Sequence, residues 1–401
     1  MLNTNNMSKS KSIEIKPDIE TFAKIKVIGI GGSGGSAINR MIKSKLRGIE
    51  FIAINTDAQA LNNNDSTKRI HIGKETTRGL GAGMDPELGA QAAEESEDEI
   101  RTALDGADMV FLTCGLGGGT GTGAAPIVAD IAREIGALTV AVVTKPFSFE
   151  GAQRRGIAER GLDSLIDKVD TIITIPNDRI LQVIDKKTSL LDAFAIVDEV
   201  LKQGVQGISE IITIPGLINV DFADVKAIMQ NAGSALMGIG RSSGENRAVE
   251  AARSAIDSPL LELSIRGAKG VLFTVAGGPD LTMHEVNEAA EVITSSVDPN
   301  ARIIFGSIID ESLNDEIKIT VIATGFNAAR NEKELESQKK KEDIINPTPY
   351  IRPDNVANKN LFSKRITPHP IEKAKPDVPA KTKEEEDLEI PAFIRKKMGD
   401  K

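Results

Sequence analysis

Short apolar segments alternate with amphipathic segments through the first half of the chain. In the amphipathic segments, apolar residues recur at helical spacing, as at Ala37, Ile38, Met41 and Ile42. Strands covered by helices on both faces are apolar throughout, and strands that alternate with helices are typical of a parallel sheet. The pattern therefore predicts an α/β fold with a doubly wound parallel sheet. The predicted strands are Ile25–Ile30, Phe51–Ile54, Met109–Thr113, Thr139–Thr144 and Thr171–Ile175.

A longer amphipathic segment then predicts one long central helix, from Ser189 as a suitable N-cap to about Ile212. Pro215-Gly216 interrupts the pattern, and a second, smaller α/β unit is predicted after it. Strands follow one another more closely there, which favours a mixed sheet. The predicted strands are Ala235–Ile239, Gly270–Val275, Arg302–Ile309 and Ile317–Thr324, and the predicted helices follow Asp221 and occupy Gly244–Asp257 and Asp280–Val297.

Composition divides the 401 residues further. Residues 1–22 are polar, which predicts a disordered N-terminal tail. Residues 327–384 are rich in proline, lysine and glutamate and bury too little apolar surface to order themselves, so a disordered linker is predicted. The other predicted parts are a first domain at 23–188, the central helix at 189–213, a second domain at 214–326 and a C-terminal peptide at 385–401.

Charge and composition exclude several classes of function. The net charge is −9 and aromatic residues make up 3%, which argues against nucleic acid as a partner because phosphates bind basic patches and bases stack on aromatic rings. The single cysteine, Cys114, excludes an intramolecular disulfide and is interpreted as a small buried apolar residue. The histidines are scattered, and neither a secretory signal nor an apolar run of about 18 residues occurs, so we expect a cytoplasmic protein without direct membrane insertion.

A glycine-rich loop follows the first predicted strand and precedes a helix. Glycines let the backbone approach a phosphate, and the helix N-terminus offers free N–H groups. Gly29, Gly31 and Gly34 satisfy the G-x-G-x-x-G pattern, and Asp57 stands where a dinucleotide enzyme would hold a ribose. An NAD-dependent Rossmann oxidoreductase, another phosphate-binding protein and a turn without a ligand all remain open. A P-loop is excluded because no G-x-x-x-x-G-K-[ST] pattern occurs.

A second glycine-rich loop, Gly115–Gly123, follows the strand at Met109–Thr113 and opens another helix. Its amides, together with the hydroxyls of Thr120 and Thr122, form a second predicted phosphate cradle. Two cradles at adjacent strand ends favour a triphosphate held from both sides, whereas a dinucleotide fold usually needs one.

The sequence Gly-Gly-Gly-Thr-Gly-Thr-Gly at 117–123 resembles the signature loop of the tubulin/FtsZ family of GTPases. The resemblance covers about Lys24 to Phe326 and returns in the C-terminal peptide. It implies a GTP-binding first domain, GTP and GDP as ligands, and Mg²⁺ bound through the phosphates, with no protein residue assigned to the metal. The other segments that resemble the family are Asn55–Leu61, Thr144–Phe147, Ile175–Asp178 and Asn219–Asp224.

The resemblance also implies roles for particular residues in nucleotide binding. Ser33 stands where the family usually has glycine or alanine, and Ser36 where it usually has asparagine; Ser36 still offers a backbone N–H and a hydroxyl to a phosphate. Without the family, Phe194 and Asp198 would be interpreted as ordinary helix residues. The implied contacts are the phosphates for Gly32, Ser33, Gly34, Gly35 and Ser36, the β- and γ-phosphates for Gly119, Thr120 and Gly121, the ribose and phosphate side for Glu150 and Arg154, and the guanine for Asn177, Phe194 and Asp198, with Asn55 also in the nucleotide site.

The first domain lacks an evident group to activate water, and the candidate carboxylates are Asp221 and Asp224. From the residues alone, Asp221 would only cap the helix that follows it. The resemblance implies instead that this loop enters the nucleotide site of the next subunit, where both carboxylates act on the attacking water and Asn219 seats the loop. An interface of that kind repeats without closing, so a head-to-tail homopolymer is expected, with GTP hydrolysis activated by polymerisation.

The C-terminal peptide combines a small apolar cluster with basic residues, a composition typical of a peptide that folds onto a partner. Its resemblance to the family implies docking onto membrane-tethering and regulatory division proteins, in a septal ring at the mid-cell division site of a bacterium. The alternatives are a solvated terminus and, for the whole chain, a GTP-binding scaffold that assembles without catalysis. The expected partner-binding residues are Ile390, Pro391, Phe393, Ile394 and Arg395.

Overall fold

The structure is a computed structural model, and it describes residues 23–326 except Arg47, Val183, Lys186, Pro215 and residues 259–263. The predicted tail at 1–22, the linker at 327–384 and the peptide at 385–401 therefore lie outside the described residues. The expected partner-binding residues from Ile390 to Arg395 lie outside them as well.

One sheet of ten strands runs through the described part of the chain, in the order β3-β2-β1-β4-β5-β6-β7-β10-β8-β9. Neighbours from β3 to β7 are parallel, β10 is antiparallel to β7 and β8, and β8 is parallel to β9. The predicted combination of a doubly wound parallel sheet and a mixed sheet is confirmed. The strands are β1 (Ile25–Ile30), β2 (Ile49–Asn55), β3 (Lys68–His71), β4 (Met109–Gly115), β5 (Leu138–Lys145), β6 (Thr171–Pro176), β7 (Gly233–Ser243), β8 (Gly270–Gly277), β9 (Arg302–Ile309) and β10 (Glu316–Thr324).

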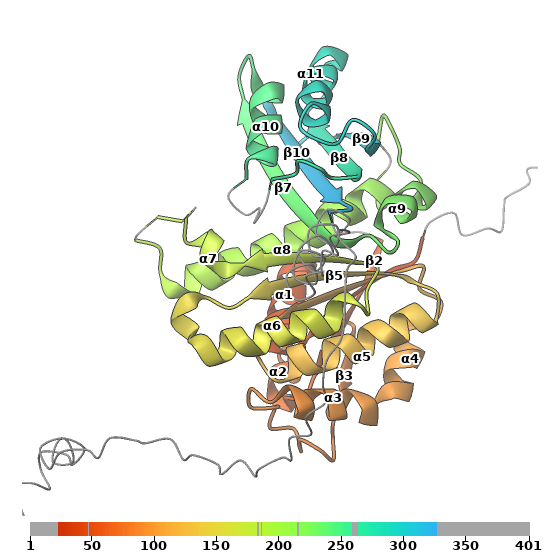
Figure 1. The fold of residues 1–401 in the computed structure, drawn as a ribbon, viewed down its shortest axis with the longest axis vertical. Helices are drawn as coiled ribbons and strands as arrows, with labels where there is room; N and C mark the ends of the chain where they lie inside the picture. The colour runs from red at the N-terminus through yellow and green to blue at the C-terminus, as the bar shows by residue number, and fades with distance from the viewer. Residues whose placement is uncertain are drawn as a thin grey trace, which may run out of the picture. The chain divides into compact units, whose positions relative to one another are not determined.

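Helices cover both faces of this sheet (Figure 1). The predicted central helix is α8, and its N-cap Ser189 accepts a hydrogen bond from the amide of Asp192 at 3.1 Å, as expected. The helices are α1 (Gly31–Lys43), α2 (Ala58–Asn62), α3 (Pro86–Glu95), α4 (Glu97–Leu104), α5 (Thr120–Glu134), the 3-10 turn η1 (Ser148–Glu150), α6 (Ala152–Ile166), α7 (Asn177–Ile180), α8 (Leu190–Thr213), α9 (Phe222–Met229), α10 (Arg247–Ile256) and α11 (Met283–Thr294).

The apolar core has three parts. One lies between the sheet and the apolar stripes of α1, α8 and α9. A second lies on the opposite face of the sheet, under α3, α4, α5 and α6. The third joins α10 and α11 to strands β8 and β10, with Leu236 of β7 packed against it, and Figure 1 shows these two helices beside those strands. Strands with helices on both faces explain why the predicted segments were apolar throughout.

The sheet brings the two glycine-rich loops together. β1 pairs with β2 on one side and β4 on the other, so the strand order reverses direction between β1 and β4. In open α/β sheets, ligands bind outside the carboxyl ends of the strands at such a point. The first loop follows β1 and the second follows β4, so both glycine-rich loops lie at this point.

β3 was not expected from the sequence. It has four residues, and only Ile70 is fully buried while Lys68, Arg69 and His71 are partly or wholly exposed. A strand this short shows neither an apolar run nor a clear alternation, so its pairing with β2 rests on tertiary contacts.

Candidate functional site

The two glycine-rich loops are in direct contact. A β-carbon placed on Gly31 would lie 3.2 Å from the amide nitrogen of Gly121, and Gly31 also has a positive φ of 73°. A β-carbon placed on Gly34 would lie 2.4 Å from the carbonyl oxygen of Thr113 in β4. Glycine is therefore required at both positions, because a side chain would push the loops apart.

Each loop opens a helix whose first turn has no side-chain cap. The N-cap residues of α1 and α5 are Ile30 and Gly119, and neither makes a side-chain capping hydrogen bond. The unpaired N–H groups and the helix dipole favour an anion at such an end. A β-carbon placed on Gly32 or Gly118 would have no atom within 4 Å, so open space adjoins both loops. This arrangement fits phosphates.

A cavity of about 220 Å³ opens beside these loops, at the carboxyl ends of β1, β4, β5 and β6. The predicted nucleotide-site residues that line it are Ser33, Ser36, Glu150, Arg154, Asn177, Phe194 and Asp198. The other predicted residues belong to the adjoining loops and strand end and do not line this cavity; they are Gly32, Gly34, Gly35, Asn55, Gly119, Thr120 and Gly121.

One end of the cavity is rich in acceptors. Asn177 is 5% exposed, and its Oδ1 has no hydrogen-bond partner among the described residues. Burial raises the pKa of Asp198 to about 6, and the charge of Arg40 partly counteracts this effect. Phe194 leaves part of its ring open and packs edge-on against Phe147, with ring centroids 5.6 Å apart. Two acceptors beside an open ring suit a planar base with N–H donors along one edge, such as guanine.

Hydrogen bonds join the two walls of the cavity. Glu150 and Arg154, on η1 and α6, form an ion pair of 3.1 Å. Ser148 donates from its amide to Asp178 at 2.8 Å and from its hydroxyl to the other carboxylate oxygen, while Arg155 donates to that hydroxyl at 2.6 Å. Asp178 follows Asn177 in the chain, so this network fixes the side that carries Glu150 to the side that carries Asn177.

Several residues that line the cavity were not among the predicted site residues. Thr144 and Pro146 lie at the end of β5, and Val197 follows Phe194 by nearly one turn of α8. The signal available for the first two was their place just after an apolar strand, because the carboxyl ends of parallel strands line ligand sites. Asp178 does not line the cavity, and its hydrogen bonds with Ser148 gave no local signal because the two residues are distant in sequence.

The candidate catalytic residues lie elsewhere. Asp221 and Asp224 open α9, after the end of α8, and neither lines the cavity. Asp221 occupies the N-cap position without making a side-chain cap, both carboxylates are exposed, and neither has a hydrogen-bond or ion-pair partner among the described residues. The side-chain oxygen of Asn219 accepts from the amide of Gly216 at 2.6 Å, which shapes the loop that leads to Asp221.

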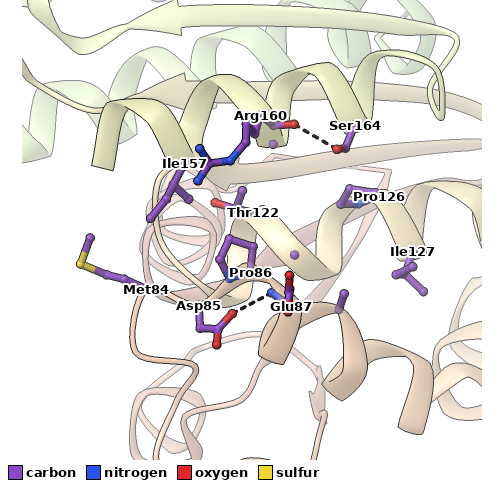
Figure 2. Close-up of a pocket in the computed structure, with 13 residues that line it drawn as sticks. Met84, Asp85, Pro86, Glu87, Thr122, Pro126, Ile127, Ile157, Arg160 and Ser164 are labelled. Atoms are coloured by element: carbon purple, nitrogen blue, oxygen red, sulfur yellow. Dashed lines mark hydrogen bonds between the residues drawn. The ribbon is translucent and has the colours of Figure 1, made fainter. Parts of the chain in front are cut away.

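A second cavity, of about 570 Å³, lies between the starts of α3 and α5 and the middle of α6 (Figure 2). Thr122 lines it, and the hydroxyl of this residue accepts from the amide of Gly117 at 2.9 Å inside the second glycine-rich loop. The hydroxyl of Thr122, which was predicted to join the second phosphate cradle, is therefore used inside the loop, and its residue lines this cavity instead of the candidate site. The other predicted nucleotide-site residues do not line this cavity. It therefore adjoins the second loop from behind and is separate from the candidate site.

Other chemistry has little support in the described part of the chain. It contains no cluster of three or more histidine, cysteine, aspartate or glutamate residues placed to hold a metal ion. Cys114 is fully buried, and burial raises the pKa of its thiol to about 12, so it stays protonated and apolar, as interpreted from the sequence. No described helix combines the length and the apolar character needed to cross a bilayer.

Comparisons with known proteins agree with this geometry. A model of the GTPase domain of the Tubulin/FtsZ family matches residues 24–185, and a model of the C-terminal domain of the FtsZ family matches residues 233–327. An FtsZ dimer structure from M. jannaschii is 50% identical, with a TM-score of 0.74, over 77% of this chain and 90% of that one. The chain belongs to the tubulin/FtsZ family.

Two further solved structures share the fold of this chain at lower sequence identity. CetZ1 from Haloferax volcanii, a GDP-bound monomer, is 23% identical, with a TM-score of 0.67 over 75% of this chain and 94% of that one. CetZ2 from the same organism, a GTPγS-bound protofilament, is 22% identical, with a TM-score of 0.65 over 80% and 99%.

Family membership resolves the ambiguity of the first glycine-rich loop. The chain is a tubulin-like GTPase of the cell-division and cytoskeletal class, with GTP and GDP as its nucleotides. This favours the triphosphate interpretation over the NAD-dependent oxidoreductase that Gly29, Gly31, Gly34 and Asp57 left open.

Proposed function

We propose that this chain is a self-assembling GTPase of cell division, in which GTP bound to one copy is hydrolysed with carboxylates from the next copy. One observation carries the proposal: the nucleotide cavity and the candidate carboxylates lie at opposite ends of α8. This helix has 24 residues and a length of about 36 Å. Phe194 and Asp198 belong to its first turns, whereas Asp221 and Asp224 follow its last turn. Each half-site is incomplete without the other.

GTP would lie across the carboxyl ends of the parallel strands. Guanine would stack on Phe194 and donate to Asn177 and Asp198, which supplies the missing partner of Asn177 Oδ1. Glu150 and Arg154 would face the ribose and the phosphates. The proposed phosphate-binding residues are Gly32, Ser33, Gly34, Gly35 and Ser36 in the first loop and Gly119, Thr120 and Gly121 in the second, with Asn55 nearby.

Mg²⁺ fits this site only through the nucleotide. Because the described residues contain no cluster of acidic groups placed to hold a metal, the ion would be bound by phosphate oxygens. When bound, it neutralises charge on the β- and γ-phosphates.

The exposed carboxylates suit the task of orienting water. Asp221 and Asp224 are separated by one helical turn and project to one side. Neither is engaged by a partner among the described residues, so both are free to accept hydrogen bonds from a water next to the γ-phosphate of another copy. Asn219 would keep the loop in shape through its contact with Gly216.

Exposed apolar residues at both ends support a head-to-tail contact. Leu190 and Leu191 are 62% and 80% exposed at the start of α8, near the cavity. Leu217 is 72% exposed in the loop before Asp221. We propose that these side chains belong to the two contacting surfaces, because two different surfaces in contact generate a filament. The related FtsZ from M. jannaschii has been solved as a dimer.

In the cell, this filament would form the septal ring at the mid-cell division site, in the cytoplasm of a bacterium. Hydrolysis would remove the γ-phosphate at the joint between two copies and weaken that joint. The peptide at 385–401, outside the described residues, would recruit membrane-tethering and regulatory division proteins through Ile390, Pro391, Phe393, Ile394 and Arg395.

Phosphate release per subunit, followed against protein concentration with GTP and Mg²⁺, tests the shared site. We expect the rate per subunit to fall on dilution as the joints are lost. Asp221→Ala should bind GTP and assemble in light scattering but lose turnover by about 10²-fold or more. Asp163→Ala, which removes an exposed carboxylate of α6, should behave like the unmodified chain. A rate independent of concentration, or normal turnover by Asp221→Ala, would contradict the proposal.

A further inference from the structure

Two buried threonine hydroxyls meet beneath the second glycine-rich loop. Thr120 is the first residue of α5 and is 9% exposed. Thr56 follows the end of β2 and is fully buried. Their Oγ1 atoms are 2.6 Å apart, although the residues belong to different parts of the chain. This is a short, direct hydrogen bond.

The backbone around Thr56 is held firmly. Its carbonyl oxygen lies 3.2 Å from Nε2 of His71, at the end of β3, and 3.4 Å from the hydroxyl of Thr77. A carbonyl only accepts, so Nε2 of His71 donates to it, whereas the single proton of the Thr77 hydroxyl has a nearer acceptor in the carbonyl of Gly73 at 2.9 Å. With its carbonyl held by His71 and its side chain fully buried, Thr56 presents its hydroxyl to Thr120 in a fixed position.

The direction of this hydrogen bond follows from counting protons. The two hydroxyls carry two protons, and one proton occupies the contact between them. Among the described residues, no other acceptor is found for either hydroxyl. Thr56 is fully buried, so its proton has nowhere to point except Thr120, because an unpaired buried donor is costly. The proton of Thr120 is then directed away from Thr56 and is left for another acceptor.

We infer that Thr56 is a positioning residue that orients the Thr120 hydroxyl as a donor to the terminal phosphate of the triphosphate, so that the site distinguishes GTP from GDP. The inference rests on the proposed function, which places Thr120 among the residues that hold the phosphates, and it assigns this hydroxyl to the γ-phosphate. By accepting from Thr56, the hydroxyl of Thr120 also becomes a stronger donor, since linked hydrogen bonds polarise one another. Donors fixed before the ligand arrives need no reorganisation when it binds.

Dissociation constants for GTP and GDP, measured with the full chain below its assembly concentration, test this inference. Thr56→Val removes the hydroxyl and keeps the shape, whereas Thr56→Ser keeps the hydroxyl. We expect Thr56→Val to weaken GTP binding on the order of tenfold, as for one hydrogen bond to a charged group, with GDP binding unchanged. Thr56→Ser should keep the original ratio of the two constants. The ratio does not depend on the fraction of folded protein, so partial misfolding does not obscure the result.

Thr113→Val serves as the matched control. It removes another fully buried hydroxyl from the same sheet, one with no hydrogen-bond partner among the described residues, and should leave the ratio unchanged. In a Thr120→Val background, Thr56→Val should have no further effect on the ratio, because the two residues act as a unit. Equal losses of GTP and GDP binding in Thr56→Val, or the same loss in Thr56→Ser, would overturn the inference. Failure of the unmodified chain to bind GTP would instead overturn the proposed function.

Discussion

At the scale of single residues, the end of the cavity that carries Asn177 and Asp198 suits a ligand with several N–H donors. Asn177 Oδ1 has no partner among the described residues, and Asp198 has a pKa raised to about 6 by burial. Both features cost free energy in the unliganded chain, because buried acceptors and charges prefer partners. A ligand that donates two hydrogen bonds along one edge removes both costs, which is a physical reason for selecting guanine.

The raised pKa of Asp198 predicts that nucleotide affinity depends on pH. Only the ionised carboxylate offers acceptors on both oxygens, because protonation turns one of them into an O–H donor. GDP affinity should therefore be highest above about pH 7 and fall as the pH drops through 6. Well below the pKa, each pH unit should weaken binding about tenfold, because the ionised fraction falls by that factor. Titration with a fluorescent guanine nucleotide between pH 5 and 8 would measure this slope.

Asp198→Asn provides the control for that titration. The amide does not titrate, so the slope should disappear. Its NH₂ group donates where the carboxylate accepted, so the variant should prefer a xanthine nucleotide, which has a carbonyl in place of the guanine amino group. If the slope persisted in Asp198→Asn, the titrating group would be a different residue.

At the scale of elements, two glycines of the first loop have different roles. Gly34 is required for packing against β4, whereas Gly32 adjoins the proposed phosphate site. A β-carbon on Gly34 would lie 2.4 Å from the Thr113 carbonyl, whereas one on Gly32 would meet nothing within 4 Å. Gly34→Ala should therefore lower the free energy of unfolding by about 1–3 kcal/mol, because β1, α1 and β4 are forced apart. Gly32→Ala should leave stability unchanged or raise it, since alanine favours a helix.

Gly32→Ala, which should not lower stability, should instead lower the affinity for nucleotide. We propose that a phosphate lies in the open space at Gly32. The methyl group added by Gly32→Ala should therefore weaken GTP and GDP binding on the order of tenfold. Urea unfolding without nucleotide and titration with nucleotide measure the two effects separately. Full affinity in Gly32→Ala would show that no phosphate occupies that space.

Much of this architecture could be predicted from the sequence because local patterns determine it. The bounds of β1 and β9 and the N-cap Ser189 agree with the expectation, since apolar runs and capping residues are local signals. β3 and the hydrogen bonds of Asp178, which follows the cavity residue Asn177, could not be found in this way. β3 lacks an apolar run, and Asp178 depends on a hydrogen bond from Ser148, distant in sequence.

The contact between the two glycine-rich loops depends both on local sequence patterns and on the order of the strands in the sheet. The sequence predicts two strand–loop–helix junctions, and it favours a triphosphate only if their strands are neighbours. The pairing of β1 with β4 supplies that condition, and the contact of Gly31 with Gly121 follows from it. The pairing of β6 with β7, which makes one continuous sheet, has no comparable signal because Thr171 and Gly233 are far apart in sequence.

At the scale of the whole molecule, the length of α8 is the decisive feature. This helix of 24 residues spans about 36 Å, with the cavity wall in its first turns and Asp221 after its far end. Bending cannot bring the two together without breaking the packing of α8 in the core, where Val200, Leu201 and Val205 are buried. A second copy is therefore the economical way to complete the site.

Mixing two inactive variants tests this arrangement directly. Asp221→Ala keeps the cavity and loses the carboxylate, whereas Asp198→Ala keeps the carboxylate and loses guanine binding. Each alone should release little phosphate. In an equimolar mixture, about a quarter of the joints pair an intact cavity with an intact Asp221 loop from the neighbour, so turnover should recover to about that fraction of the unmodified rate. A chain carrying both changes, mixed with Asp221→Ala, makes no such joint and should recover nothing. If the first mixture gave only the sum of its two components, both half-sites would have to belong to one copy, and the separation along α8 would lose its functional meaning.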